Sequence, residues 1–133
     1  MNFEQEALDA LKSLQAEYLN SVWKTFAALM VSIGWVMSSQ ETRHFLEATL
    51  AVKGVAIAVV LGLALMHWLT LHDLQTKSQR IFDQILHRDE LFGAVKTSYE
   101  IKRIYIYASF LINGLLYVLL LTIILNADST LST

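Results

Sequence analysis

Long uncharged stretches alternate with polar stretches along this chain. Residues 104–127 form an uncharged run of 24 residues, and residues 54–72 form another of 19. A helix needs roughly 20 mostly apolar residues to cross about 30 Å of hydrocarbon. The two runs therefore predict membrane-spanning helices at about residues 104–126 and 50–71.

A third span is predicted at about residues 18–38, where the uncharged run covers only residues 25–40. The full span includes Lys24, whose aliphatic stem lets its ammonium reach the headgroup layer. A soluble helical domain is disfavoured, because a 24-residue uncharged run has no solvated face. The start of the chain is acidic and does not resemble a cleavable signal peptide, so we expect the first span to be retained.

The connection between the second and third spans also carries a helical pattern. Residues 72–103 contain no proline and one glycine, Gly93, which is the expected turn. Thr97 and Glu100 have the spacing of a capping box at the start of a returning helix. Apolar and small residues recur at steps of three and four from the second span outward: Leu71, Leu74, Ser78, Ile81 and Ile85. The segment therefore predicts a helical hairpin at about residues 72–103.

The N-terminal segment is amphipathic as well, with apolar positions at helical spacing between residues 3 and 20. Residues 1–17 could join a bundle or lie on the membrane surface. Their four acids and one lysine favour the bundle, because anionic lipid repels acidic segments. On the far side, Ser38 and Glu41 have capping-box spacing in a short turn. The prediction is one all-α membrane domain, residues 1–133, extended into the cytoplasm as a three-helix bundle.

Charge sets the expected orientation and excludes several protein classes. Ten Lys and Arg against twelve Asp and Glu give a net charge of −2, so nucleic acid is not an expected partner. With three spans, only Arg43 and Lys53 flank the outer side. The inner side carries Lys12, Lys24, Lys77, Arg80, Arg88, Lys96, Lys102 and Arg103. The N-terminus is therefore predicted to be cytoplasmic and the C-terminus outside, with a bacterial inner membrane as the expected location.

Polar and small residues inside the spans are the candidate functional positions. Asn113, with Ser109 one turn earlier, could face a pore, contact a quinone or hydrogen-bond to a neighbouring helix. Gly54, Ala58 and Gly62 form a small-residue ladder along the second span. Such a ladder lets another backbone approach closely, whether from the same chain, a second copy or a different subunit.

His67 is the candidate haem ligand, because it is the only histidine within a span. Neither of the other spans supplies a second histidine, and His72 is rotated about 140° from His67 on an ideal helix. A haem would therefore need a ligand from another chain. Without cysteines, disulfides, thiolate metal sites and iron–sulfur clusters are excluded. We expect no resident cofactor and no metal site.

The functional prediction is a small non-catalytic membrane protein, because no phosphate loop, nucleophile elbow or metalloprotease helix is present. Its expected partners are membrane lipid and another membrane subunit, against which it would pack as an accessory or assembly component. Three alternatives remain open. They are a homo-oligomeric pore lined by Ser32, Ser109 and Asn113, a haem or quinone anchor near His67, and a toxin-immunity protein.

Overall fold

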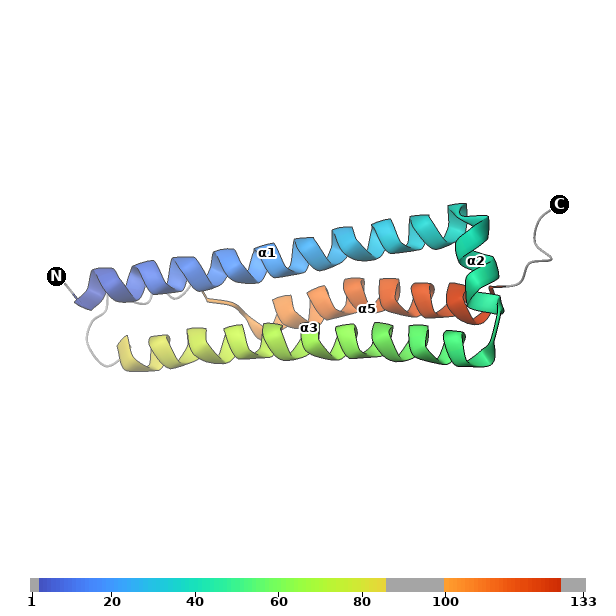
Figure 1. Ribbon diagram of the computed structural model, residues 1–133. Helices are drawn as coiled ribbons and strands as arrows, with labels where there is room; N and C mark the ends of the chain where they lie inside the picture. Colours follow the sequence, from blue (N-terminus) through green and yellow to red (C-terminus); the bar gives the residue numbers. More distant parts are fainter. Residues whose placement is uncertain (1–2, 86–99, 128–133) are drawn as a thin grey trace.

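The computed structural model describes residues 3–85 and 100–127. These residues form four helices and no strand: α1 (Phe3–Ser38), α2 (Gln40–Glu47), α3 (Leu50–Ile85) and α5 (Arg103–Leu125). Figure 1 shows α1, α3 and α5 running alongside one another, with the short α2 turning across one end. The all-helical class predicted from the sequence is confirmed for these residues.

The three long helices match the three predicted spans. α1 and α3 each contain 36 residues and α5 contains 23, which correspond to about 54 Å and about 34 Å. Each has an apolar stretch long enough to cross a membrane. Only 17% of each of these stretches is buried inside the chain, so most of their apolar surface needs lipid or a partner to cover it.

Packing between the long helices is divided into three layers of buried side chains. The largest layer lies toward α2 and joins Leu29, Val60 and Tyr117 from the three helices. A middle layer surrounds Leu71, which is completely buried. The third layer pairs Leu11 of α1 with Phe82 of α3. The seam predicted from steps of three and four thus supplies three buried residues in the second half of α3, Leu71, Leu74 and Ser78.

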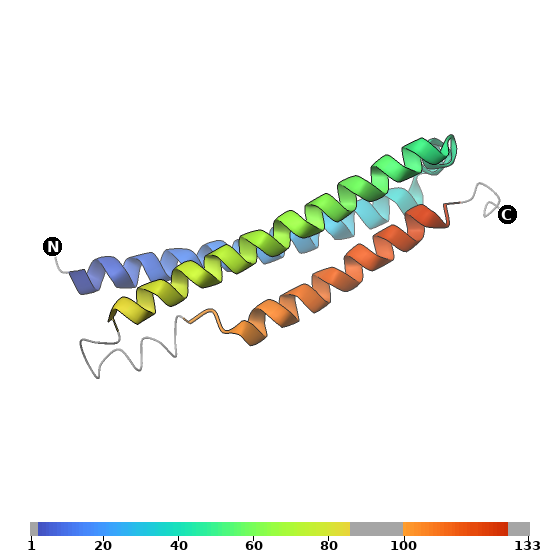
Figure 2. The same cartoon turned by 90° about the horizontal axis from the view of Figure 1, so that it is seen from below.

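At the end where α1 begins, α1 and α3 continue past the start of α5 (Figures 1 and 2). Leu11 is 1% exposed there, which favours the bundle over the surface helix for the N-terminal segment. The predicted three-helix extension is wrong in one part, because residues 100–102 are not helical and α5 begins only at Arg103. The predicted turn at Gly93 and the Thr97 cap lie outside the described residues.

The non-helical approach to α5 has a physical cause. Ile101 is 3% exposed and belongs to the middle layer with Tyr18 and Leu71. Lys102, the N-cap of α5, has an extended backbone with φ −65° and ψ 143°. Burial of Ile101 against α1 and α3 therefore holds this stretch outside the helix, and Glu100 is not part of a helical first turn.

The opposite end is a short helix rather than the simple turn predicted from the sequence. Ser39, not Ser38, is the N-cap of α2, and its hydroxyl accepts a hydrogen bond from the backbone N–H of Thr42. Leu46 turns inward to join the largest buried layer. Lys53, near the start of α3, donates to the carbonyl oxygen of Leu125 at 3.2 Å. A cation at this position also complements the negative end of the α5 dipole.

Candidate functional site

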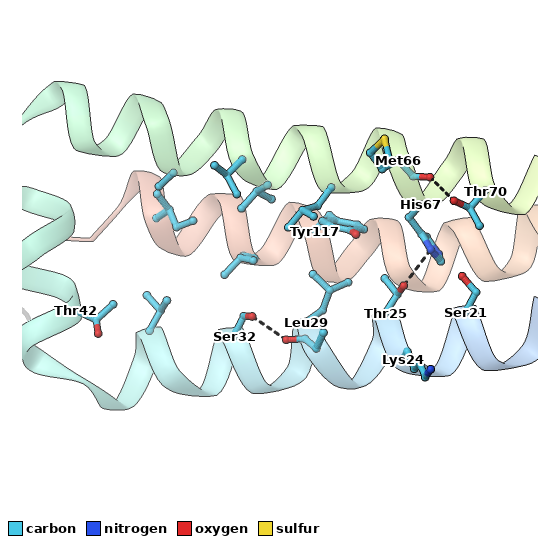
Figure 3. Close-up of a pocket in the computed structure, with 18 of the residues that line it drawn as sticks. Ser21, Lys24, Thr25, Leu29, Ser32, Thr42, Met66, His67, Thr70 and Tyr117 are labelled. Carbon is cyan, nitrogen blue, oxygen red and sulfur yellow. Dashed lines mark hydrogen bonds between the residues drawn. The ribbon is translucent and has the colours of Figure 1, made fainter.

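Three polar side chains meet where α1, α3 and α5 pack together. His67 on α3 is 8% exposed, and Asn113 on α5 is 1% exposed. Nδ1 of His67 lies 3.0 Å from the Thr25 hydroxyl on α1, and Nε2 of His67 lies 3.2 Å from Nδ2 of Asn113. His67 therefore connects all three long helices through one imidazole ring (Figure 3 shows its contact with Thr25).

The direction of these hydrogen bonds follows from the groups involved. An amide N–H of Asn113 can only donate, so Nε2 of His67 accepts. The ring proton of the neutral imidazole is then on Nδ1, which donates to the Thr25 hydroxyl. The arrangement leaves neither ring nitrogen of His67 free to bind iron, so this geometry disfavours the haem hypothesis.

Within the part of the chain that the structure describes, only the Nδ2 end of the Asn113 amide has a hydrogen-bond partner. Its Oδ1 is buried and has no hydrogen-bond partner there. An unpaired acceptor in an apolar layer costs free energy. The hydrogen bond to His67 offsets part of that cost and favours one registration of α3 against α5.

A second interhelical hydrogen bond lies nearer the start of α5. The hydroxyls of Tyr18 on α1 and Ser109 on α5 are 2.8 Å apart. Trp68 of α3 packs edge-on against Phe110 at a ring-centroid distance of 4.8 Å. Ser109 and Asn113, which the sequence placed on one face of a span, thus bond to two different helices of their own chain.

The small-residue ladder on α3 is exposed, unlike the buried polar side chains described above. Gly54, Ala58 and Gly62 are all exposed. A methyl group added at Gly54 or Gly62 would meet no heavy atom within 4 Å, its immediate surroundings on the helix aside. Packing within the described part of the chain therefore does not use the ladder.

An open groove of about 690 Å³ runs between α1 and α3 (Figure 3). Its floor includes the buried side chains Tyr117, Leu120 and Ile124 of α5. Its polar wall residues gather toward the end where α1 begins, and they include Ser21, Lys24, Thr25, His67 and Thr70. Figure 3 shows Ser21 and Thr25 pointing from α1 toward α3, whereas the Lys24 side chain lies over the α1 ribbon.

Sequence reasoning found His67 and Asn113 but missed Thr25 and the groove. Thr25 lies next to Lys24 at the edge of the shortest uncharged run, where a single hydroxyl carries little signal. Thr25 could have been found by comparing the depths of all polar residues in the three spans rather than those of the histidines alone. Among the described residues no cluster of three or more His, Asp or Glu side chains could hold a metal ion.

Comparison with protein-family models, with curated proteins and with solved structures finds no match. Function must therefore be argued from the chain's own residues.

Proposed function

We propose that this chain is a multi-pass protein of a bacterial inner membrane, with a cytoplasmic N-terminus and a C-terminus on the outside. The three apolar helices support the crossing, and the excess of Lys and Arg beside the inner ends supports the orientation. The extension formed by α1 and α3 beyond α5 would then stand in the cytoplasm.

Within that membrane, the proposed role is a non-catalytic accessory or assembly subunit that packs against a larger membrane complex. The observation that carries this proposal is the exposed ladder of Gly54, Ala58 and Gly62. Helices associate in lipid mainly through close backbone approach, which small residues permit. The ladder supplies such a surface on α3, and α1 and α5 do not cover it.

The alternatives draw less support from the geometry. A pore lined by Ser32, Ser109 and Asn113 would need these groups to face a lumen. Ser109 and Asn113 instead bond to other helices of the chain, and the Ser32 hydroxyl donates to the Ala28 carbonyl of its own helix. A haem anchor would need His67 to give up a hydrogen bond. A toxin-immunity protein remains the second candidate, because the same exposed ladder could oppose a helix of a pore-forming toxin within the bilayer.

The test is the effect of Gly62→Leu on proteins that copurify with the tagged chain in mild detergent. We expect at least a tenfold loss of the copurifying partner, because the leucine fills the approach surface. The free energy of unfolding should change by only about 1 kcal/mol, since the added side chain points into open space. Quantitative mass spectrometry of the eluate measures the first effect, and a denaturation curve measures the second.

Gly34→Leu is the matched control, because Gly34 is an exposed glycine of α1 whose added methyl group would also meet nothing. Its eluate should equal that of the wild type. Equal partner loss in both variants, or full retention by Gly62→Leu, would contradict the proposed interface. Recovery of only a second, differently tagged copy would replace the accessory role with self-association.

A further inference from the structure

The groove between α1 and α3 is amphipathic along its length. Beyond the polar end at Ser21 and Thr70, its lining is mostly apolar: Ala28, Leu29, Val36, Leu46, Ala56, Val59, Val60, Leu63 and Met66. The distance along α1 from Ser21 to Val36 is about 22 Å. A ligand that matches this groove has a polar group at one end and a long apolar part.

The polar end carries a positive charge without a counter-ion in the described part of the chain. Lys24 forms no ion pair there, and the Asp73 carboxylate at the end of the second span is already bonded to Lys77 at 2.6 Å. A charge inside a membrane span is costly unless it is paired. The Lys24 side chain lines this end of the groove, and its long aliphatic stem allows the ammonium to reach the headgroup layer.

The depth of this end suits a phosphate group. Thr70 lies three residues from Asp73, a charged residue at the end of the second span, so it is about 4.5 Å further in. The Thr70 hydroxyl donates to the carbonyl of Met66 and has no further proton to offer an anion, whereas the Ser21 hydroxyl lines the same end of the groove as Lys24. An anion a few ångströms below the membrane surface would thus meet a cation and a hydroxyl donor.

The size of the groove suits a small apolar ligand. Small-molecule sites typically measure about 300–1,000 Å³, and the groove measures about 690 Å³. A lipid acyl chain therefore fits between α1 and α3.

We propose that this groove binds one anionic phospholipid, with its phosphate beside Lys24 and Ser21 and an acyl chain over the α5 floor. The inference rests on the membrane placement proposed above but not on the ladder contact. Bound in this way, the lipid would neutralise the unpaired ammonium and cover apolar side chains that α1 and α3 leave open. It would be a structural lipid that holds α1 and α3 together.

The experiment is native mass spectrometry of the full chain in mild detergent, titrated with phosphatidylglycerol or with phosphatidylcholine of the same acyl chains. Phosphatidylglycerol should bind the wild type more tightly. Lys24→Gln should weaken that binding by roughly fivefold, the worth of one basic residue near an anionic lipid. Lys24→Arg should retain the binding, and so should Lys77→Gln, which removes an exposed cation outside the groove.

A second pair of variants tests the acyl-chain part without changing any charge. Leu63→Trp fills the groove from its α3 wall and should weaken phosphatidylglycerol binding, whereas Leu65→Trp lies outside the lining and should not. Equal affinity for both lipids, or equal binding by Lys24→Gln and Lys77→Gln, would overturn the proposal. Competition by inorganic phosphate or palmitate at the same concentration would also overturn it, in favour of a free anion or a fatty acid.

Discussion

Replacing Leu71 by alanine is expected to lower the free energy of unfolding by about 2–4 kcal/mol. Leu71 is completely buried in the middle layer, between Tyr18 of α1 and Ile106 of α5. Truncation removes contacts to both neighbouring helices and leaves a cavity that a straight, packed helix cannot collapse. An SDS titration of the protein in mild-detergent micelles, followed by tryptophan fluorescence, measures the loss.

Leu69→Ala is the control for that experiment, since Leu69 lies two residues away on α3 and is 52% exposed. Its effect should stay within about 1 kcal/mol. Equal destabilisation by the two variants would mean that α3 does not present the face of Leu71 to α1 and α5. The three-helix packing described here would then be wrong at its most buried position.

The second large effect is expected at His67, where alanine should cost about 2 kcal/mol through the loss of two interhelical hydrogen bonds. The same substitution leaves the buried Asn113 amide with neither end paired. A double-mutant cycle with Asn113→Ala should give a coupling energy of about 0.6–1.7 kcal/mol. The same SDS titration provides all four stabilities.

Thr70→Ala controls for the loss of a polar group from α3, because the Thr70 hydroxyl bonds only within its own helix, to the carbonyl of Met66. It should change the stability by less than about 0.5 kcal/mol. Strict additivity of His67→Ala and Asn113→Ala would show that these two side chains do not meet. A structural role for His67 would then lose its support, and ligand hypotheses for it would regain theirs.

Much of the fold could be predicted because apolar runs and the absence of proline leave few alternatives to long helices. The end of α1 at Ser38 and the start of α3 at Leu50 coincide with the predicted span limits. The start of α5 at Arg103 also lies within one residue of the predicted span limit, but the non-helical backbone of residues 100–102 could not be predicted in this way. Ile101 is buried against two other helices and residues 100–102 are not helical. A local sequence pattern carries no information about such contacts.

The contact between His67 and Asn113 could not be predicted from the sequence either. Asn113 lies ten residues from Arg103, whereas His67 lies only six from Asp73, yet their side chains meet. Counting inward from the nearest charge therefore places them at different depths, because Arg103 lies further along the bundle from this contact than Asp73 does. Relative helix registration depends on packing between helices, and a single sequence does not reveal it.

The central claim is that the chain crosses a membrane three times, so that its two ends lie on opposite sides. The sequence contains no cysteine, so single-cysteine variants report without background. We would introduce cysteine at Gln5, Glu41, Gln84 and Ser132 and treat intact bacterial cells with a membrane-impermeant thiol reagent. Cysteines at positions 41 and 132 should react in intact cells, and those at positions 5 and 84 only after permeabilisation. Reaction of positions 5 and 132 from the same side would contradict the three-span account.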